Sequence, residues 1–261
     1  MKIAQISDLH VTAEGNTLGV APMAENLEKV VTHINGLGPD VVLVSGDIAD
    51  TGRLADVERA AKILARLEAP FYVTPGNHDA RDALKEGMPA AALPAQQAGH
   101  LSYVVELPKL RILALDSTDP DTPNGRICAA RAAWLAAELE ASTKPALIFM
   151  HHPPLKFSVD ETDRPPLEGA DLLADVVAGR HHIERIVCGH IHLFAQAQWQ
   201  GHLVCTAPSM GMRLNWSPNE AIESGFLLSP PAYLWHMLNE DGQMITHAFS
   251  LDNPEGPFAF S

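Results

Sequence analysis

Five short apolar runs in this chain each end in an Asp, Asn or His side chain, and this pattern limits the possible folds more than any other feature. An apolar run of this length between turn-forming residues predicts a strand buried on both faces. Parallel strands bring their carboxyl ends to one sheet edge, where α/β proteins bind ligands. A single Asp after Gly is most often a turn residue, but repetition after five strands predicts a metal site. The runs are residues 3–6, followed by Asp8 and His10; 41–45, by Asp47; 71–74, by Asn77 and His78; 146–150, by His151 and His152; and 186–188, by His190 and His192.

The order of the predicted elements indicates two β-sheets covered by helices. Strands alternate with helices expected at 23–37, 54–67, 129–141 and 172–177, where apolar residues recur at helical spacing. Residues 101–115, 196–206 and 233–249 are typical of antiparallel strand pairs. This combination predicts an α/β fold of two packed sheets with outer helices. We expect a main domain at 1–206 that carries the candidate site, and a region at 207–261 that forms a cap and a β-hairpin completing the second sheet.

The composition limits the partners that this chain binds. Its 18 Lys and Arg against 32 Asp and Glu give a formal net charge of −14, which repels polyanions. A long nucleic-acid substrate is therefore not expected. No apolar stretch approaches the ~20 residues that span a bilayer, so no membrane partner is expected. The amino terminus enters a predicted strand at once and leaves no room for a signal peptide, so we expect a cytoplasmic protein.

The side chains that follow the predicted strands form a mixed set of metal ligands. Two carboxylates, one amide and four imidazoles are more donors than one divalent ion usually binds, but two ions that share a carboxylate would use them well. Mixed nitrogen and oxygen donors suit Fe, Mn, Co or Zn better than Mg or Ca. Two such ions ~3.5–4 Å apart are a usual means of hydrolysing phosphate esters. The seven candidate metal ligands are Asp8, His10, Asp47, Asn77, His151, His190 and His192.

Five sequence blocks carry these ligands: Asp8-x-His10, Gly46-Asp47, Gly76-Asn77-His78-Asp79, His151-His152 and Gly189-His190-x-His192. Together, and in this order, they resemble the calcineurin-like metallophosphoesterase superfamily. Residues 7–10, 149–154 and 229–236 further resemble bacterial class III cyclic-nucleotide phosphodiesterases and glycerophosphodiesterases. The resemblance implies a four-layer sandwich of two mixed β-sheets flanked by helices, with a small C-terminal hairpin and cap region.

The resemblance also implies a role for each residue in a two-metal hydrolase of small phosphodiesters. A hydroxide bridging the two ions would attack the phosphorus. His78, which is not needed as a ligand, would be the catalytic residue that stabilises the transition state or protonates the leaving oxygen, with Asp79 orienting its ring. The two implied metal sites are Asp8, His10, Asp47 and His192, and Asp47, Asn77, His151 and His190, so that Asp47 bridges them.

Several questions stay open from the sequence. A phosphomonoesterase would use the same metal pair, and a non-catalytic scaffold of the same fold is a further alternative, although scaffolds tend to lose these ligands. His152 fits a substrate contact and a structural bond to the backbone equally well. Residues 156–168 are expected to form a mobile loop.

Apolar residues after the last ligand predict a homo-oligomer, a dimer or higher, with this region at the interface. They are Trp199, Met210, Met212, Trp216 and Trp235.

Overall fold

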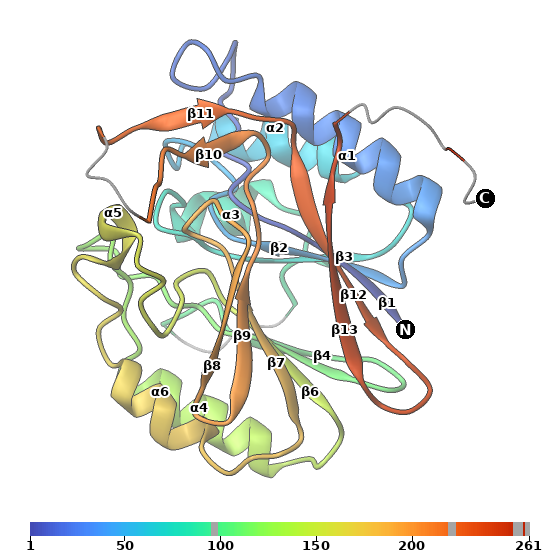
Figure 1. Cartoon of the computed structure of the whole chain (residues 1–261), viewed down its shortest axis with the longest axis vertical. Helices are drawn as coiled ribbons and strands as arrows, with labels where there is room; N and C mark the ends of the chain where they lie inside the picture. The colour runs from blue at the N-terminus through green and yellow to red at the C-terminus, as the bar shows by residue number, and fades with distance from the viewer. Residues whose placement is uncertain (95–98, 219–222, 253–257, 259–261) are drawn as a thin grey trace.

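Two β-sheets pack face to face at the centre of the molecule, and helices cover their outer faces (Figure 1). The structure, a computed structural model, describes residues 1–94, 99–218, 223–252 and 258. Both sheets contain parallel and antiparallel pairs, which confirms the predicted α/β sandwich of two mixed sheets. Within these described ranges, no helix is long and apolar enough to cross a bilayer.

The first sheet has five strands in the order β13-β12-β1-β2-β3. Strands β1, β2 and β3 run parallel, and the C-terminal hairpin of β12 and β13 pairs antiparallel with β1. The hairpin therefore extends this sheet and not the second sheet, where the sequence-based expectation placed it. All five residues of β2 are buried, as expected for a strand covered on both faces. The strands are β1 (Lys2–Ile6), β2 (Val41–Ser45), β3 (Phe71–Thr74), β12 (Ala232–Leu238) and β13 (Met244–Ser250).

The second sheet has six strands in the order β4-β5-β6-β7-β9-β8. The central strands β5, β6, β7 and β9 run parallel, and an antiparallel neighbour closes each edge. The strands are β4 (Tyr103–Glu106), β5 (Arg111–Ala114), β6 (Ala146–Phe149), β7 (Ile183–Cys188), β8 (Ala195–Trp199) and β9 (His202–Thr206).

The helices form the two outer layers. Helices α1 (Met23–Leu37) and α2 (Leu54–Leu64) lie over the first sheet, and α4 (Ala129–Glu140) and α6 (Ala170–Val177) lie over the second (Figure 1). Helix α1 ends where the sequence predicts, because Gly38 adopts a left-handed φ of 60° and its N–H bonds to Ile34 O. One apolar cluster fills the space between the sheets and under α1 and α2, and a second lies between the six-stranded sheet and the other two helices.

Two helical elements go beyond the sequence prediction. Helix α3 (Arg81–Gly87) follows the third strand and is too short to show a periodic apolar face. The expected loop at 156–168 contains one helical turn, α5 (Asp160–Asp163). Its last residue, Asp163, is buried and accepts hydrogen bonds from the backbone N–H groups of Phe157 and Val159, so this part of the loop is held by its own side chain.

The region after the last candidate ligand is also more ordered than a cap of irregular loops. Strands β10 (Met212–Leu214) and β11 (Phe226–Leu228) pair as a small two-stranded sheet. Met210, Met212 and Trp235 are buried in the main core. These three side chains therefore do not support the predicted oligomer interface, because the fold of the single chain already covers them.

Candidate metal centre

The predicted ligands meet at the edge where the two sheets present the carboxyl ends of their parallel strands. Asp8 and His10 follow β1, and Asp47 follows β2. His151 follows β6, and His190 follows β7. The structure brings all seven predicted ligands together, including Asn77 after β3 and His192 two residues beyond His190.

Four of them form a first group of donor atoms. His192 Nε2 lies 3.1 Å from His10 Nε2 and 3.5 Å from Asp8 Oδ1. His10 Nε2 lies 3.6 Å from Asp47 Oδ2. One donor atom of each of these four residues lies within 4.8 Å of the other three. This is the set that the sequence blocks imply for one metal.

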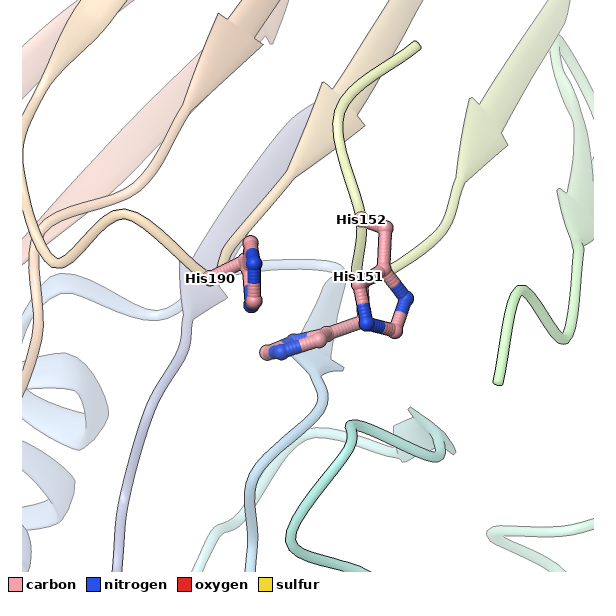
Figure 2. A group of neighbouring side chains, drawn as sticks. All are labelled: His151, His152 and His190. Atoms are coloured by element: carbon pink, nitrogen blue, oxygen red, sulfur yellow. The ribbon is translucent and has the colours of Figure 1, made fainter. Parts of the chain in front are cut away.

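A second group lies next to the first. Asn77 Oδ1 lies 3.0 Å from His151 Nε2 and 2.9 Å from His190 Nδ1. His151 Nε2 also lies 3.3 Å from Asp47 Oδ2. Figure 2 shows His151 and His190 reaching toward each other from different loops, with His152 beside them. These contacts bring together the four residues implied for the other metal.

Asp47 Oδ2 is the atom that the two groups share, since it lies close to both His10 and His151. The other carboxylate oxygen accepts a hydrogen bond of 2.8 Å from the backbone N–H of His78. Burial is the largest single effect and would raise the pKa of Asp47, but the charge and hydrogen bond of His151, together with His10 and His78, outweigh it and hold that pKa well below its usual value. The carboxylate is therefore charged, which is the form that binds cations.

The backbone fixes the orientation of two ligand imidazoles. His151 Nδ1 lies 2.8 Å from Ser45 O, and His192 Nδ1 lies 2.6 Å from Met212 O. A carbonyl oxygen only accepts, so Nδ1 carries the hydrogen in both rings. In each ring Nε2 is therefore the nitrogen left to bind a metal, as in metal-binding histidines whose second nitrogen is held by an acceptor.

Asp50 belongs to the site but lies outside the predicted set. Its Oδ1 lies 3.3 Å from His10 Nδ1, and its carbonyl oxygen accepts a hydrogen bond from His78 Nδ1 at 2.6 Å. The only signal in the sequence is the spacing of Asp47 and Asp50 in the turn after β2. That signal is weak, because acidic residues are common in turns.

Backbone strain is concentrated at the candidate ligands. Eight described non-glycine residues have positive φ, and five of them are ligands of these two groups. Such conformations cost about 1–3 kcal/mol each and persist where the surrounding structure requires them. The adjoining glycines leave no space for a side chain, because a Cβ at Gly76 or Gly189 would overlap Asp47 or Asp8. The five strained ligands are Asp8, His10, Asp47, His190 and His192.

The donor atoms fit two divalent ions. The nitrogens of His10 and His192 face each other at 3.1 Å, an arrangement that requires a cation or a proton between them. Burial lowers the pKa of His190 well below its usual value, with the neighbouring His152 and His151 adding to the effect, so this imidazole is neutral and ready to bind a metal. The mixture of imidazole, carboxylate and amide donors is typical of first-row transition metals.

Comparison with known proteins agrees with this geometry. The sequence pattern of the calcineurin-like phosphoesterases matches residues 1–194. The chain belongs to this family. Among its relatives, a probable glycerophosphodiester phosphodiesterase, GpdQ, of Arcobacter nitrofigilis is 30% identical, and the match covers 100% of this chain and 97% of the relative. The 3',5'-cyclic adenosine monophosphate phosphodiesterase CpdA of Escherichia coli K12 is 28% identical over 96% of this chain and 90% of its own length.

Solved structures show the same fold. A dimetal phosphatase from Danio rerio superposes with a TM-score of 0.73 at 17% identity, covering 96% of each chain. A purple acid phosphatase from yellow lupin superposes with a TM-score of 0.64 at 12% identity, covering 96% of this chain and 53% of the other. Family membership and the two His/Asp clusters together identify the chain as a metallophosphoesterase.

In this calcineurin-like phosphoesterase, His78 lies at the rim of the metal groups. Its ring stands edge-on to the ring of His10, with centroids 4.6 Å apart. The prediction that Asp79 orients this ring is wrong. The Asp79 carboxylate instead accepts backbone N–H groups of Ile48, Ala49 and Gly76 and so joins the loops after β2 and β3.

His152 has a structural role in this phosphoesterase. Its Nδ1 lies 2.9 Å from Ser117 Oγ and its Nε2 lies 3.0 Å from Pro123 O, and the residue is only 2% exposed. Burial and the nearby His151 lower the pKa of His152 to about 3, so the ring is neutral. Both nitrogens are occupied, which decides between the two alternatives in favour of a structural bond to the backbone.

Proposed function

We propose that this chain hydrolyses small phosphodiesters of the glycerophosphodiester or cyclic-nucleotide type with two divalent ions of Fe, Mn, Co or Zn. Asp8, His10, Asp47 and His192 would hold one ion, and Asp47, Asn77, His151 and His190 the other. When bound, the ions supply a hydroxide at neutral pH and neutralise the phosphoryl oxygens. Relatives named as diesterases that match nearly the whole chain support the choice of diesters.

The observation that carries this proposal is the shared carboxylate of Asp47 between two groups of donor atoms. One Oδ2 lies within 3.6 Å of His10 Nε2 and 3.3 Å of His151 Nε2, which suits a bridging ligand. Two ions held by these residues would supply the two-metal chemistry of in-line displacement at phosphorus.

His78 is the residue that we assign to the leaving group. The ring donates from Nδ1 to Asp50 O, so Nε2 is the nitrogen left for the substrate. Asn77 and His78 also line a cavity of about 1040 Å³ that opens beside the metal groups. A histidine between the ions and this cavity is placed to protonate an ester oxygen as its bond to phosphorus breaks.

Relatives named as diesterases, matched over nearly the whole chain, favour a diester over a monoester. The test is metal analysis of the purified protein together with turnover rates on glycerophosphodiesters, cyclic nucleotides and monoesters. We expect two ions per chain and the highest kcat/KM on a diester. Preference for monoesters would favour the phosphomonoesterase alternative, and a metal-loaded protein inactive on every ester would favour a scaffold.

A further inference from the structure

The cavity beside His78 contains an arginine that the catalytic assignment does not use. Arg81 lies at the start of α3, three residues after His78, and lines the cavity. Its Nε donates to Asp116 Oδ2 at 2.7 Å, and its Nη2 donates to Asp116 Oδ1 at 3.2 Å and to Thr118 O at 2.8 Å. Asp116 is fully buried. The guanidinium is therefore held rigidly from one side.

One amino group of this guanidinium has no hydrogen-bond partner among the described residues. Arg81 Nη1 forms no hydrogen bond with any residue in the described ranges, and the side chain is 20% exposed. An arginine fixed by a buried carboxylate loses little entropy when it donates one more hydrogen bond. Such a group suits recognition of an oxygen atom on a ligand in the cavity.

The charges around the cavity disfavour an anionic ligand group. Arg81 is paired with Asp116. Four further aspartates line the cavity with one lysine, Lys85; they are Asp79, Asp82, Asp119 and Asp121. His100 on the opposite wall adds no charge, because burial and the nearby Arg131 lower its pKa. A neutral substituent therefore fits these walls better than a second phosphate or a carboxylate.

The residue types on the walls also disfavour a nucleobase. Among the described residues that line the cavity there is no Phe, Tyr or Trp. Proteins that hold a base usually stack it on such a ring, which contributes about 1–3 kcal/mol per base. The lining instead contains hydroxyl, amide and charged groups, which hydrogen-bond to alcohols, beside apolar residues such as Leu101 and Pro120.

We propose that this cavity is the subsite for a small, neutral, hydroxyl-bearing alcohol arm of the diester, and that Arg81 Nη1 donates a hydrogen bond to a hydroxyl oxygen of that arm. The inference rests on the proposed diesterase activity and adds a specificity-determining residue to it. Because His78 lies at the same cavity, the arm bound there is the one released as the alcohol.

The test compares two diesters that differ only in hydroxyl groups, methyl glyceryl phosphate and methyl propyl phosphate. The measured quantity is the ratio of their kcat/KM values for release of glycerol and of propanol. We expect the wild-type ratio to favour the glyceryl ester, and Arg81→Met to lower the ratio about 10- to 100-fold, the range for one hydrogen bond to a charged donor. Arg81→Lys keeps the ion pair with Asp116 and removes Nη1, so it is expected to lower the ratio as well.

Lys85→Met is the matched control, since Lys85 is a second cation on the same cavity and is half-exposed. It is expected to leave the ratio unchanged, whereas an equal effect of both variants would show a general charge effect and overturn the assignment to Arg81. Calorimetric Kd values for glycerol phosphate and propyl phosphate give a readout independent of turnover. Arg81→Lys is expected to weaken the binding of glycerol phosphate and to leave the binding of propyl phosphate unchanged.

Bis(4-nitrophenyl) phosphate, which carries no hydroxyl group, separates failure of the subsite from failure of the proposed function. Hydrolysis of this ester with a wild-type glyceryl-to-propyl ratio near one would overturn the subsite and leave the diesterase proposal in place. Faster turnover of 3',5'-cyclic AMP than of the glyceryl ester would overturn the ligand class. No hydrolysis of any diester by metal-loaded protein would overturn both proposals.

Discussion

His78 Nδ1 lies 2.6 Å from the backbone carbonyl oxygen of Asp50. Because a carbonyl accepts, this contact fixes the tautomer and the direction of the ring. Asp50 Oδ1 also lies 3.3 Å from His10 Nδ1, so one residue orients both the proposed acid and a candidate ligand. The turn after β2 therefore links metal binding to the group that acts on the substrate.

His78→Ala is expected to keep both metal ions and to lose about 10²–10⁴-fold in turnover on alkyl diesters, the usual range for general acid–base catalysis. A nitrophenolate leaves without protonation, so the loss on a nitrophenyl diester is expected to be clearly smaller. Turnover on both substrates and metal content are the measurements. Equal losses would indicate electrostatic stabilisation of the phosphoryl group instead, and loss of metal would place His78 among the ligands.

His152→Phe is expected to lower the free energy of unfolding by about 2 kcal/mol or more. It removes the ring nitrogens that bond the buried Ser117 hydroxyl and the Pro123 carbonyl, and loss of a partner by a buried polar group costs about 1–3 kcal/mol. Urea unfolding checks this, with His181→Phe at an exposed position as the control. An unchanged stability combined with a raised KM would show that His152 contacts substrate.

The positions of the ligands follow from the sequence because each one lies in the short loop that follows an apolar strand. Asp47 after 41–45 is the clearest case, since a run this apolar fits only a central strand. The helix at 23–37 is likewise predictable at both ends, from Pro22 and Gly38. In these stretches local propensity and tertiary burial favour the same structure.

Other features depend on contacts between distant segments and have no local signal. Arg81 and Asp116 are far apart in sequence, and nothing in either stretch predicts that they pair under the cavity. The sequence around Met210 and Trp235 does not show whether these side chains pack against a partner subunit or in the core of their own chain. Asp79 sits beside His78, but its carboxylate turns to the backbone of Ile48 and Ala49, a choice set by the packing of two loops.

The folded protein is expected to lose stability in acid partly through His236. This ring is fully buried, with Nδ1 2.8 Å from Thr246 Oγ1 and Nε2 3.0 Å from Gln5 Oε1. Burial, helped by Arg185, lowers the pKa of His236 to about 3. The unfolded chain protonates near pH 6.5, so between about pH 6.5 and 3 it binds a proton that the folded chain does not.

The contribution of His236 to the free energy of unfolding therefore has its full value above about pH 6.5. It falls by about 1.4 kcal/mol per pH unit as the pH decreases. Unfolding free energies of wild type and His236→Gln between pH 5 and 7.5 check this, because the ligand histidines titrate alike in both proteins and their effect cancels in the difference. The variant is expected to show the smaller slope. Parallel slopes would assign the acid sensitivity to other groups.

The protein is expected to form a dimer or a higher oligomer through the region after His192. Leu227 and Leu228 on β11 are 41% and 57% exposed, and β11 pairs only with β10 among the described residues. An apolar edge strand of this kind is a ready site for a second copy. Light scattering is expected to give at least twice the chain mass for wild type and a smaller mass for Leu228→Glu. A wild-type monomer at micromolar concentration would exclude this oligomer.

The central claim is that Asp47 joins two metal sites, and the number of metal ions bound per chain tests it most directly. Elemental analysis of purified wild type, Asn77→Ala and Asp47→Ala gives this number. We predict two ions for wild type and about one for Asn77→Ala, since Asn77 contacts only the second group. Asp47→Ala is predicted to bind fewer ions than Asn77→Ala, because Oδ2 lies in both groups. Two ions per chain in Asp47→Ala, with turnover near that of wild type, would contradict the claim.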